Sequence, residues 1–339
     1  MSIFNKEIKI KALSALGTYL LIGDEELRKT IISAKNKNAW FTEDQVENAV
    51  IATGRLLNEE NLNRWIENHQ FNSSKKIGLT LAGNIPLVGF HDILAVLISG
   101  NIALIKLSGS DDILIPFILK KLIEIEPLFK EQIQIIDKLS DFDAVIATGS
   151  NNTSRYFEYY FSKVPHIIRK NRNSVAVLNG KESNDDLKAL GRDILDYFGL
   201  GCRNVSKIYV PKNYSFIPFF EAIQEYHSII NHHKYSNNYD YNKSIFLVNK
   251  VEHLDNGFLL VAKNESLSSP LSVVFYEEYE NLSEVQKTLE EKQENIQVVV
   301  SKSISDIPLA TTFFGNSQQP NLWDYADGID TLKFLSSLN

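Results

Sequence analysis

Short apolar segments alternate with longer amphipathic segments over most of the chain, beginning near residue 76. Runs such as 77–82, 101–107 and 174–178 have the length and composition of buried strands. The segments between them, for example 111–125, have the length and apolar spacing of helices. A connection between parallel strands needs a dozen or more residues, and helices of this length supply them. The sequence therefore predicts an α/β protein with doubly wound parallel sheets.

The first 70 residues lack this alternation. From residue 6 to residue 68, apolar positions recur every three or four residues, which indicates amphipathic helices. Residues 38–43 interrupt the pattern, and Thr42 followed by Gln45 has the spacing of a helix N-cap with a capping box. We therefore expect an all-helical cap over residues 1–70, followed by a sheet-containing region over residues 76–170.

The length of 339 residues is sufficient for two lobes, each with its own core. We place the boundary between the lobes near residues 169–174, before a second series of strands and helices that continues to about residue 304. Residues 231–243 are polar and rich in Tyr and Asn, and we expect them to form a surface loop at the entrance for the substrate.

Composition and charge exclude several classes of function. The net charge of −7 argues against a nucleic-acid-binding face. No apolar run reaches the roughly 20 residues of a membrane span, and residues 1–11 lack the apolar core of a secretion signal. The seven histidines and the single cysteine show no metal-ligand spacing, so we expect no metal site. One cysteine cannot form an intrachain disulfide, and we expect a cytoplasmic protein.

That one cysteine, Cys202, lies in the glycine-rich segment 198–204 (FGLGCRN). Glycines allow a substrate to approach the backbone closely, and the Cys202 N–H could donate to a developing oxyanion. The neighbouring Arg203 would favour the nucleophilic thiolate. A lone cysteine is also often a small buried hydrophobic residue, and this segment alone leaves both interpretations open.

Three further segments follow strands, which is where open α/β sheets build their binding sites. Asn84 lies in LAGNIP (81–86), where the alternative is an ordinary turn. Lys106 ends a strand and precedes Ser-Gly-Ser at 108–110, which could bind a ribose and phosphate or form an ordinary strand-to-helix loop. Thr-Gly-Ser at 148–150 precedes a helix whose N-terminal amides could bind a phosphate. It is not a Walker loop, because Gly-Lys-Ser/Thr is absent.

In their order and spacing, these residues resemble the aldehyde dehydrogenase superfamily. Within it, the chain most resembles the acyl-CoA reductase family typified by the fatty acid reductase of bacterial bioluminescence (LuxC). The segments that carry this closer resemblance are 83–86 (GNIP), 99–101 (SGN), 169–178 (RKNRNSVAVL) and 319–331 (QPNLWDYADGIDT). The resemblance covers about residues 76–335, and segment 319–331 is its most specific part.

The resemblance implies an aldehyde dehydrogenase-like fold with a cofactor-binding domain (1–170), a catalytic domain (171–310) and a C-terminal segment (311–339) that returns near the active site. It implies that Cys202 attacks the acyl carbonyl and that Asn84 and the Cys202 N–H form an oxyanion hole. The residues expected to contact the cofactor are Lys106, Ser108, Ser110, Thr148, Gly149, Ser150 and Glu265. Glu265 belongs to a loosely kept version of the family segment that touches the nicotinamide ribose, and Ser154 stands where a second glycine is usual.

The implied reaction is the NADPH-dependent reduction of a fatty acyl thioester to an aldehyde. NAD-using relatives carry a glutamate for the ribose 2′-OH a few residues after the lysine, whereas Gly109 stands there in this chain. The hydrolytic glutamate of oxidative relatives also has no counterpart, because segment 166–174 contains no carboxylate. We expect Arg169 and Arg172 to bind an anionic acyl donor such as a coenzyme A phosphate, with structural salt bridges as the alternative.

Three rival functions remain open at this point: an oxidative NAD(P)-dependent aldehyde dehydrogenase, an acyltransferase that uses Cys202 without hydride transfer, and a non-catalytic nucleotide-binding subunit. The expected substrate is an acyl-CoA or an acyl-carrier thioester. The resemblance further implies a homo-oligomer and, as a partner, an acyl-activating or acyl-protein synthetase.

Overall fold

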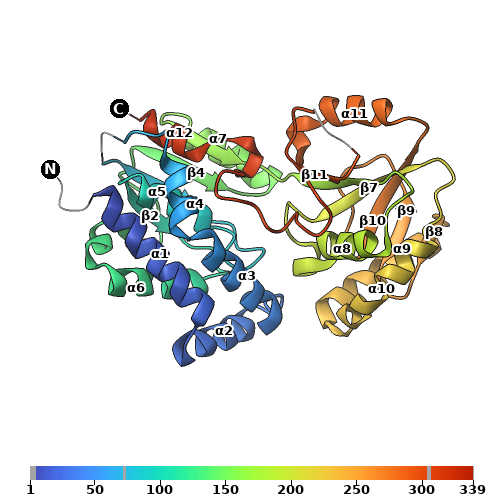
Figure 1. Cartoon of the computed structure of the whole chain (residues 1–339), viewed down its shortest axis with the longest axis horizontal. Helices are drawn as coiled ribbons and strands as arrows, with labels where there is room; N and C mark the ends of the chain where they lie inside the picture. Colours follow the sequence, from blue (N-terminus) through green and yellow to red (C-terminus); the bar gives the residue numbers. More distant parts are fainter. Residues whose placement is uncertain (1–4, 72–73, 304–306, 339) are drawn as a thin grey trace. The chain divides into compact units, whose positions relative to one another are not determined.

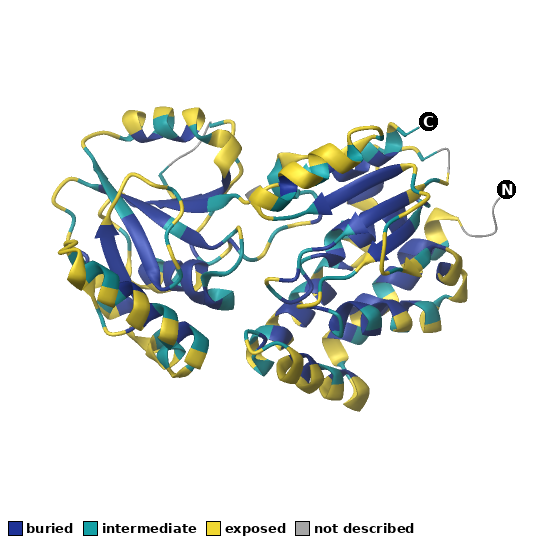
Figure 2. Cartoon of the chain, turned by 180° about the vertical axis from the view of Figure 1, so that it is seen from behind, coloured by how far each residue is buried: buried dark blue, intermediate teal, exposed yellow. Residues whose placement is uncertain are grey.

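The computed structural model describes residues 5–71, 74–303 and 307–338. The chain divides into two compact units, Met1–Asn171 with Asn321–Asn339 and Arg172–Pro320. In the described residues, the first unit contains a five-stranded sheet and the second a seven-stranded sheet. Figure 2 shows the central strands of both sheets mostly in dark blue, because they form the buried core of each unit. The predicted α/β class with parallel sheets is therefore confirmed.

The chain begins with four helices, as the apolar spacing predicts. They are α1 (Lys6–Ile22), α2 (Glu25–Lys37), α3 (Glu43–Leu56) and α4 (Glu59–Ile66). A side chain caps the N-terminus of each helix by accepting a backbone N–H, and the four caps are Asn5, Asp24, Thr42 and Asn58. The predicted break before α3 and the N-cap at Thr42 are confirmed.

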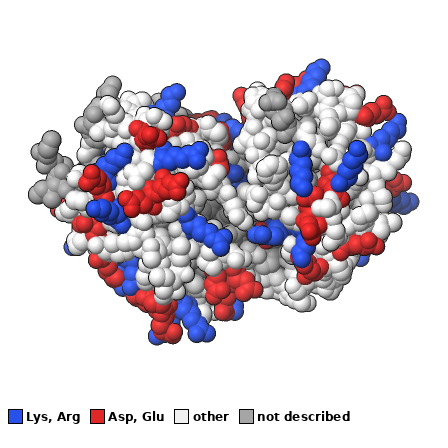
Figure 3. Space-filling view, viewed as in Figure 1, with Lys and Arg blue, Asp and Glu red and all other residues white. Residues whose placement is uncertain are grey.

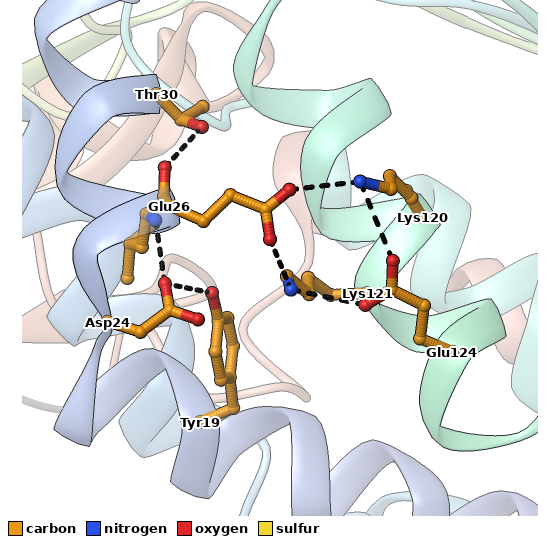
Figure 4. Close-up of polar contacts among 8 residues, drawn as sticks. Tyr19, Asp24, Glu26, Thr30, Lys120, Lys121 and Glu124 are labelled. Carbon is orange, nitrogen blue, oxygen red and sulfur yellow. Dashed lines mark hydrogen bonds and ion pairs between the residues drawn. The ribbon is translucent and has the colours of Figure 1, made fainter.

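A cluster of charged side chains links α2 to α6 (Leu114–Ile125) (Figure 4). The Glu26 carboxylate lies 2.9 Å from the Lys120 Nζ and 2.5 Å from the Lys121 Nζ. These two lysines hold the pKa of Glu26 below its usual value. On α1, the Tyr19 hydroxyl donates to Asp24, the cap of α2. The helical cap is thus tied to the sheet-containing part of its own unit by polar contacts as well as by its apolar face.

The first sheet has the strand order β3-β2-β1-β4-β5, and all its neighbouring strands are parallel. Its strands are β1 (Lys76–Thr80), β2 (Ile102–Lys106), β3 (Ile133–Ile135), β4 (Ala144–Thr148) and β5 (His166–Arg169). The connections contain α5 (Phe90–Ile98), α6 and α7 (Asn151–Phe161). The chain runs outward from β1 in one direction and then resumes at β4 on the other side. The carboxyl ends of β1 and β4 therefore flank the switch point at which such sheets bind ligands.

The second sheet has the order β12-β11-β6-β7-β10-β9-β8, and only the edge pair β8–β9 is antiparallel among its described pairs. Its strands are β6 (Asn173–Val177), β7 (Val205–Pro211), β8 (His253–Asp255), β9 (Leu260–Lys263), β10 (Val273–Tyr279), β11 (Ile296–Ser301) and β12 (Thr311–Thr312). Its α-helices are α8 (Asn184–Leu195), α9 (Ile217–Ala222), α10 (His233–Val248) and α11 (Leu282–Glu291). Ser183 and Asp186 form a capping box at the start of α8.

The prediction of a surface loop over residues 231–243 is wrong. A 3-10 helix over Gln224–Asn231 leads into α10, and His232 caps α10. Three α10 side chains are buried on one face at helical spacing: Tyr235, Tyr239 and Asn242. The Tyr235 hydroxyl donates to the Phe258 carbonyl at 3.0 Å, and Asn242 donates to the Leu271 carbonyl at 2.9 Å. Tertiary burial of these side chains outweighs the poor helix propensity of a segment rich in Tyr and Asn.

The C-terminal segment returns to the first unit and ends in α12 (Thr331–Ser336), which lies beside α5 (Figure 1). Arg169, the last residue of β5, is only 3% exposed. Its guanidinium forms an ion pair with Asp92 of α5 at 2.7 Å. It also donates to the Ala326 carbonyl at 2.7 Å and to the Thr331 hydroxyl at 2.9 Å. One buried cation therefore joins β5, α5 and the C-terminal segment.

No helix in the described part of the chain has both the length and the apolar character that crossing a bilayer requires. Acidic and basic side chains are interspersed on the face shown in Figure 3.

Removal of the Asp92 carboxylate should strongly destabilise the first unit. In Asp92→Ala the Arg169 guanidinium stays buried without its counter-ion, which typically costs about 3–5 kcal/mol. The double variant Asp92→Leu/Arg169→Met, which removes both charges, should recover most of this loss. Urea denaturation followed by circular dichroism measures the difference. A loss below about 1 kcal/mol in the single variant would show that the ion pair does not hold this unit together.

Candidate active site

The loop with Asn84 and the loop with Ser108 touch each other in the first unit. The first loop follows β1 and the second follows β2, and these strands are parallel neighbours. A Cβ added to Gly83 would lie 2.5 Å from the Ser108 Oγ, so only glycine permits this approach. Asn84 and Lys106 are exposed beside this contact. The structure thus brings three of the predicted site residues to one edge of the first sheet.

Buried Asp111 joins the loop after β1 to the loop after β2 by hydrogen bonds. Its Oδ2 accepts the Leu87 N–H at 2.8 Å, and its own N–H donates to the Ser108 carbonyl at 3.1 Å. Leu87 has a positive φ of 60°, a conformation that a leucine adopts only when its surroundings impose it. Burial raises the pKa of Asp111 to about 6, although the Leu87 N–H opposes this shift.

The helical cap supports the loop after β2 from the other side. The Asn38 amide, just after α2, donates to the Ser110 carbonyl at 3.1 Å. Lys37, the last residue of α2, forms an ion pair with Asp112 at 3.2 Å. The N-terminal helices therefore do more than cover the first sheet, because they also fix the backbone of the predicted cofactor loop.

The third predicted segment, Thr-Gly-Ser at 148–150, joins β4 to α7 at the same edge of the sheet. Ser150 caps α7 by accepting the Thr153 N–H at 3.2 Å. A Cβ on Gly149 would lie 2.9 Å from the Phe157 ring and 3.0 Å from the Thr153 side chain, so the turn requires glycine. Ser154, which replaces the usual second glycine, is buried. The α7 N-terminus offers backbone donors of the kind that bind phosphates.

Cys202 lies in the second unit, in the turn between α8 and β7, and its side chain is exposed. Exposure contradicts the alternative in which this cysteine only fills a core. The Ser174 hydroxyl donates to the Cys202 carbonyl at 2.9 Å. The side-chain oxygen of Asn204 accepts the Gly201 N–H at 2.8 Å. The backbone on both sides of Cys202 is therefore held by buried polar side chains.

Glu265 is exposed in the loop after β9, and a lysine that the sequence analysis missed supports this loop. Lys207 of β7 is buried, and its Nζ donates to the Asn264 carbonyl and to Glu277, the latter at 2.8 Å. Burial lowers the pKa of Lys207, although its contact with Glu277 opposes this shift. The available signal was a lone lysine within the apolar strand pattern 205–211.

The structure places both predicted substrate-binding arginines in structural contacts. Arg169 is buried against Asp92 and the C-terminal segment, which is the salt-bridge alternative. Its guanidinium is therefore not presented to a substrate, and we do not retain that role for it. Arg172 is half-buried and donates to the Ile296 carbonyl at 3.2 Å. The sequence could not show these partners, because they lie 77 to 162 residues away from each arginine.

The acyl-CoA reductase (LuxC) family matches residues 19–218, more than half of the chain. The matched region includes Asn84, Lys106, Thr148 and Cys202. The chain belongs to this family. Membership supports redox chemistry on aldehydes or acyl groups. No match was found among curated proteins.

Several solved structures share the fold. A putative aldehyde dehydrogenase from Burkholderia cenocepacia has a TM-score of 0.70 at 13% identity, covering 98% of this chain and 85% of that one. Aldehyde dehydrogenase 21 from Physcomitrella patens, in complex with the reaction product succinate, has a TM-score of 0.72 at 12% identity, with coverages of 99% and 84%. A cysteine-to-alanine mutant of indole-3-acetaldehyde dehydrogenase from P. syringae, in complex with NAD⁺ and IAA, has a TM-score of 0.67 at 11% identity. The match covers 88% of this chain and 72% of that one. The predicted aldehyde dehydrogenase-like fold is confirmed.

Titration of Asp111 should make the stability of the first unit depend on pH. Its pKa is about 6 in the folded chain and 3.8 without burial, so the fold favours the protonated form. The contribution of protonated Asp111 to the free energy of unfolding is complete below pH 3.8 and is lost as the pH rises through about 6. Asp111→Asn cannot ionise, so its stability relative to the wild type should rise by roughly 2 kcal/mol between pH 4 and pH 7. Urea denaturation at pH 4, 5.5 and 7 measures this difference, and a constant difference would contradict burial of the ionised carboxyl.

Proposed function

We propose that this protein reduces a fatty acyl thioester to an aldehyde with NADPH, through a covalent acyl-Cys202 intermediate. The observation that carries the proposal is the exposed thiol of Cys202 in a turn whose backbone is fixed by Ser174 and Asn204. Membership of the acyl-CoA reductase family supports the choice of an acyl thioester as substrate. A thiolate held in one place on a rigid turn is suited to nucleophilic attack on a carbonyl.

In the first half of the proposed reaction, the Cys202 thiolate forms a bond to the acyl carbon and the bond to the donor thiol breaks. The donor leaves as a thiolate and takes a proton from solvent. In the second half, the acyl carbon held on Cys202 would accept the hydride that NADPH supplies when bound. Asn84 and the Cys202 N–H donate to the oxyanion that develops in each half. Collapse of the resulting hemithioacetal releases the aldehyde and regenerates the Cys202 thiolate.

The proposed contacts to NADPH come mainly from the edge of the first sheet. Lys106, Ser108 and Ser110 would bind the ribose and its 2′-phosphate, and Thr148, Gly149 and Ser150 would bind the pyrophosphate at the α7 N-terminus. Glu265 would contact the nicotinamide ribose. The residues present fit this group, because a Cβ added at Gly109 would meet no atom within 4 Å. A neighbour with the same fold contains NAD⁺, which supports a nicotinamide cofactor.

One assay separates the reductase from the acyltransferase alternative. The protein is mixed with NADPH and an acyl-CoA, and NADPH absorbance and released thiol are followed together. Loss of NADPH with release of an equal amount of thiol supports the reductase, whereas thiol release without NADPH loss supports the transferase. In the cell, an acyl-activating or acyl-protein synthetase would supply the thioester.

Acylation of Cys202 tests the proposal directly, because the chain has no other thiol. After incubation with an acyl-CoA in the absence of NADPH, the intact mass should rise by one acyl group. Cys202→Ala should show no adduct and no reductase activity, while its melting temperature should stay close to that of the wild type, because the side chain is exposed. An equal adduct on Cys202→Ala would assign the chemistry to another residue.

The preference for NADPH is tested at Gly109. The wild type should show a kcat/KM for NADPH at least about tenfold above that for NADH, because charge-assisted contacts to a phosphate are strong. Gly109→Glu should reverse this preference, since the added carboxylate repels the 2′-phosphate and can accept from a 2′-OH. Gly109→Gln has nearly the same size without the charge and serves as the control. Equal kcat/KM values for the two cofactors in the wild type would contradict the preference.

A further inference from the structure

One buried side chain, Asn204, connects the end of α8 to the turn that carries Cys202. Asn204 is 4% exposed. Its Nδ2 lies 2.8 Å from the Asp196 carbonyl oxygen, 3.2 Å from that of Asp193 and 3.3 Å from that of Ile194. These carbonyls belong to the end of α8, where the helix itself offers no donors. The amide therefore supplies hydrogen-bond donors to backbone acceptors at the end of the helix.

The backbone between α8 and Cys202 is in a costly conformation. Tyr197, Phe198 and Gly199 have consecutive positive φ values of 53°, 59° and 77°. For a residue other than glycine, this region costs roughly 1–2 kcal/mol. Such a conformation persists only where the surrounding structure imposes it. The contacts of Asn204 on both sides of this stretch provide that constraint.

Asn204 also determines the orientation of the peptide group that precedes Cys202. Its side-chain oxygen accepts the Gly201 N–H at 2.8 Å, and its backbone N–H donates to the Gly201 carbonyl at 3.0 Å. In a planar trans peptide, the C=O of one residue and the N–H of the next point in opposite directions. The Cys202 N–H therefore points away from Asn204. On the far side of Cys202, the buried Ser174 hydroxyl holds the Cys202 carbonyl at 2.9 Å.

We infer that Asn204 is a positioning residue that aims the Cys202 N–H at the oxyanion formed during attack by the thiolate. Ser174 assists by holding the Cys202 carbonyl. Asn204 itself touches no reacting atom. The inference rests on the proposed role of Cys202 as the nucleophile. Backbone donors that are fixed before the reaction contribute most when charge develops in the transition state.

Two reactions of the same thiol separate this role from a general effect on folding. Acylation of Cys202 by an acyl-CoA passes through an oxyanion, whereas alkylation of Cys202 by iodoacetamide does not. In Asn204→Leu, which adds no charge, the single-turnover acylation rate without NADPH should fall at least about tenfold. The alkylation rate, measured from pH 6 to pH 10 on the same protein, should change by less than about threefold at its plateau, because alkylation needs no oxyanion donor.

Asn101→Leu is the matched control, since Asn101 is an equally buried asparagine of the first unit with polar contacts to Lys75 and Ser99. It should leave both rates close to those of the wild type. Ser174→Ala removes only one hydroxyl and keeps the test available if Asn204→Leu does not fold. It should slow acylation by about threefold to tenfold and leave alkylation unchanged, because it loosens the Cys202 carbonyl and not the thiol.

The outcomes distinguish the inference from the proposed function. Acylation and alkylation that fall together, or acylation that stays at the wild-type rate in both variants, would overturn the positioning role of Asn204 alone. A wild-type protein that is alkylated but never acylated would overturn the proposed function, and with it the inference. A selective loss of acylation in Asn204→Leu and Ser174→Ala would support both.

Discussion

The buried ion pair between Arg169 and Asp92 links three parts of the first unit that are distant in sequence. Asp92 lies in the first turn of α5, directly after the loop that contains Asn84, while Arg169 ends β5. The same guanidinium holds the C-terminal segment through Ala326. Although burial opposes it, Arg169 keeps the pKa of Asp92 below its usual value, so the carboxylate stays charged and the pair stays intact.

Both units follow one rule in the loops that flank their strands. A buried polar side chain holds the loop backbone by hydrogen bonds, and a neighbouring exposed side chain is accessible to a substrate or cofactor. Asp111 has this supporting role for Asn84, and Asn204 has it for Cys202. Lys207 does the same for the loop that precedes Glu265. The proposed mechanism depends on this division, because fixed donors lower the barrier without reorganising during the reaction.

The sequence predicted local features well and long-range contacts poorly. The cap at Thr42 and the loops around Asn84 and Cys202 could be found, because capping spacing and glycine-rich turns are encoded in a few neighbouring residues. Helix α10 could not, because its stability comes from burial of Tyr235 and Tyr239 against residues beyond the segment. The sequence predicts the salt bridge of Arg169 only as an alternative, since no local pattern identifies a partner 77 residues away.

The central claim is that the acyl-Cys202 intermediate is reduced and not hydrolysed. Segment 166–174 has no carboxylate to activate water, and Arg169 in this segment forms an ion pair with Asp92. A missing general base typically slows such a step by about 10² to 10⁴-fold. The most direct measurement is the fate of isolated acyl-Cys202 enzyme, with and without NADPH, followed by mass spectrometry and product analysis. We predict rapid release of aldehyde with NADPH and a deacylation rate in water at least about 100-fold slower. Release of free acid at a rate that matches the reduction would contradict the claim.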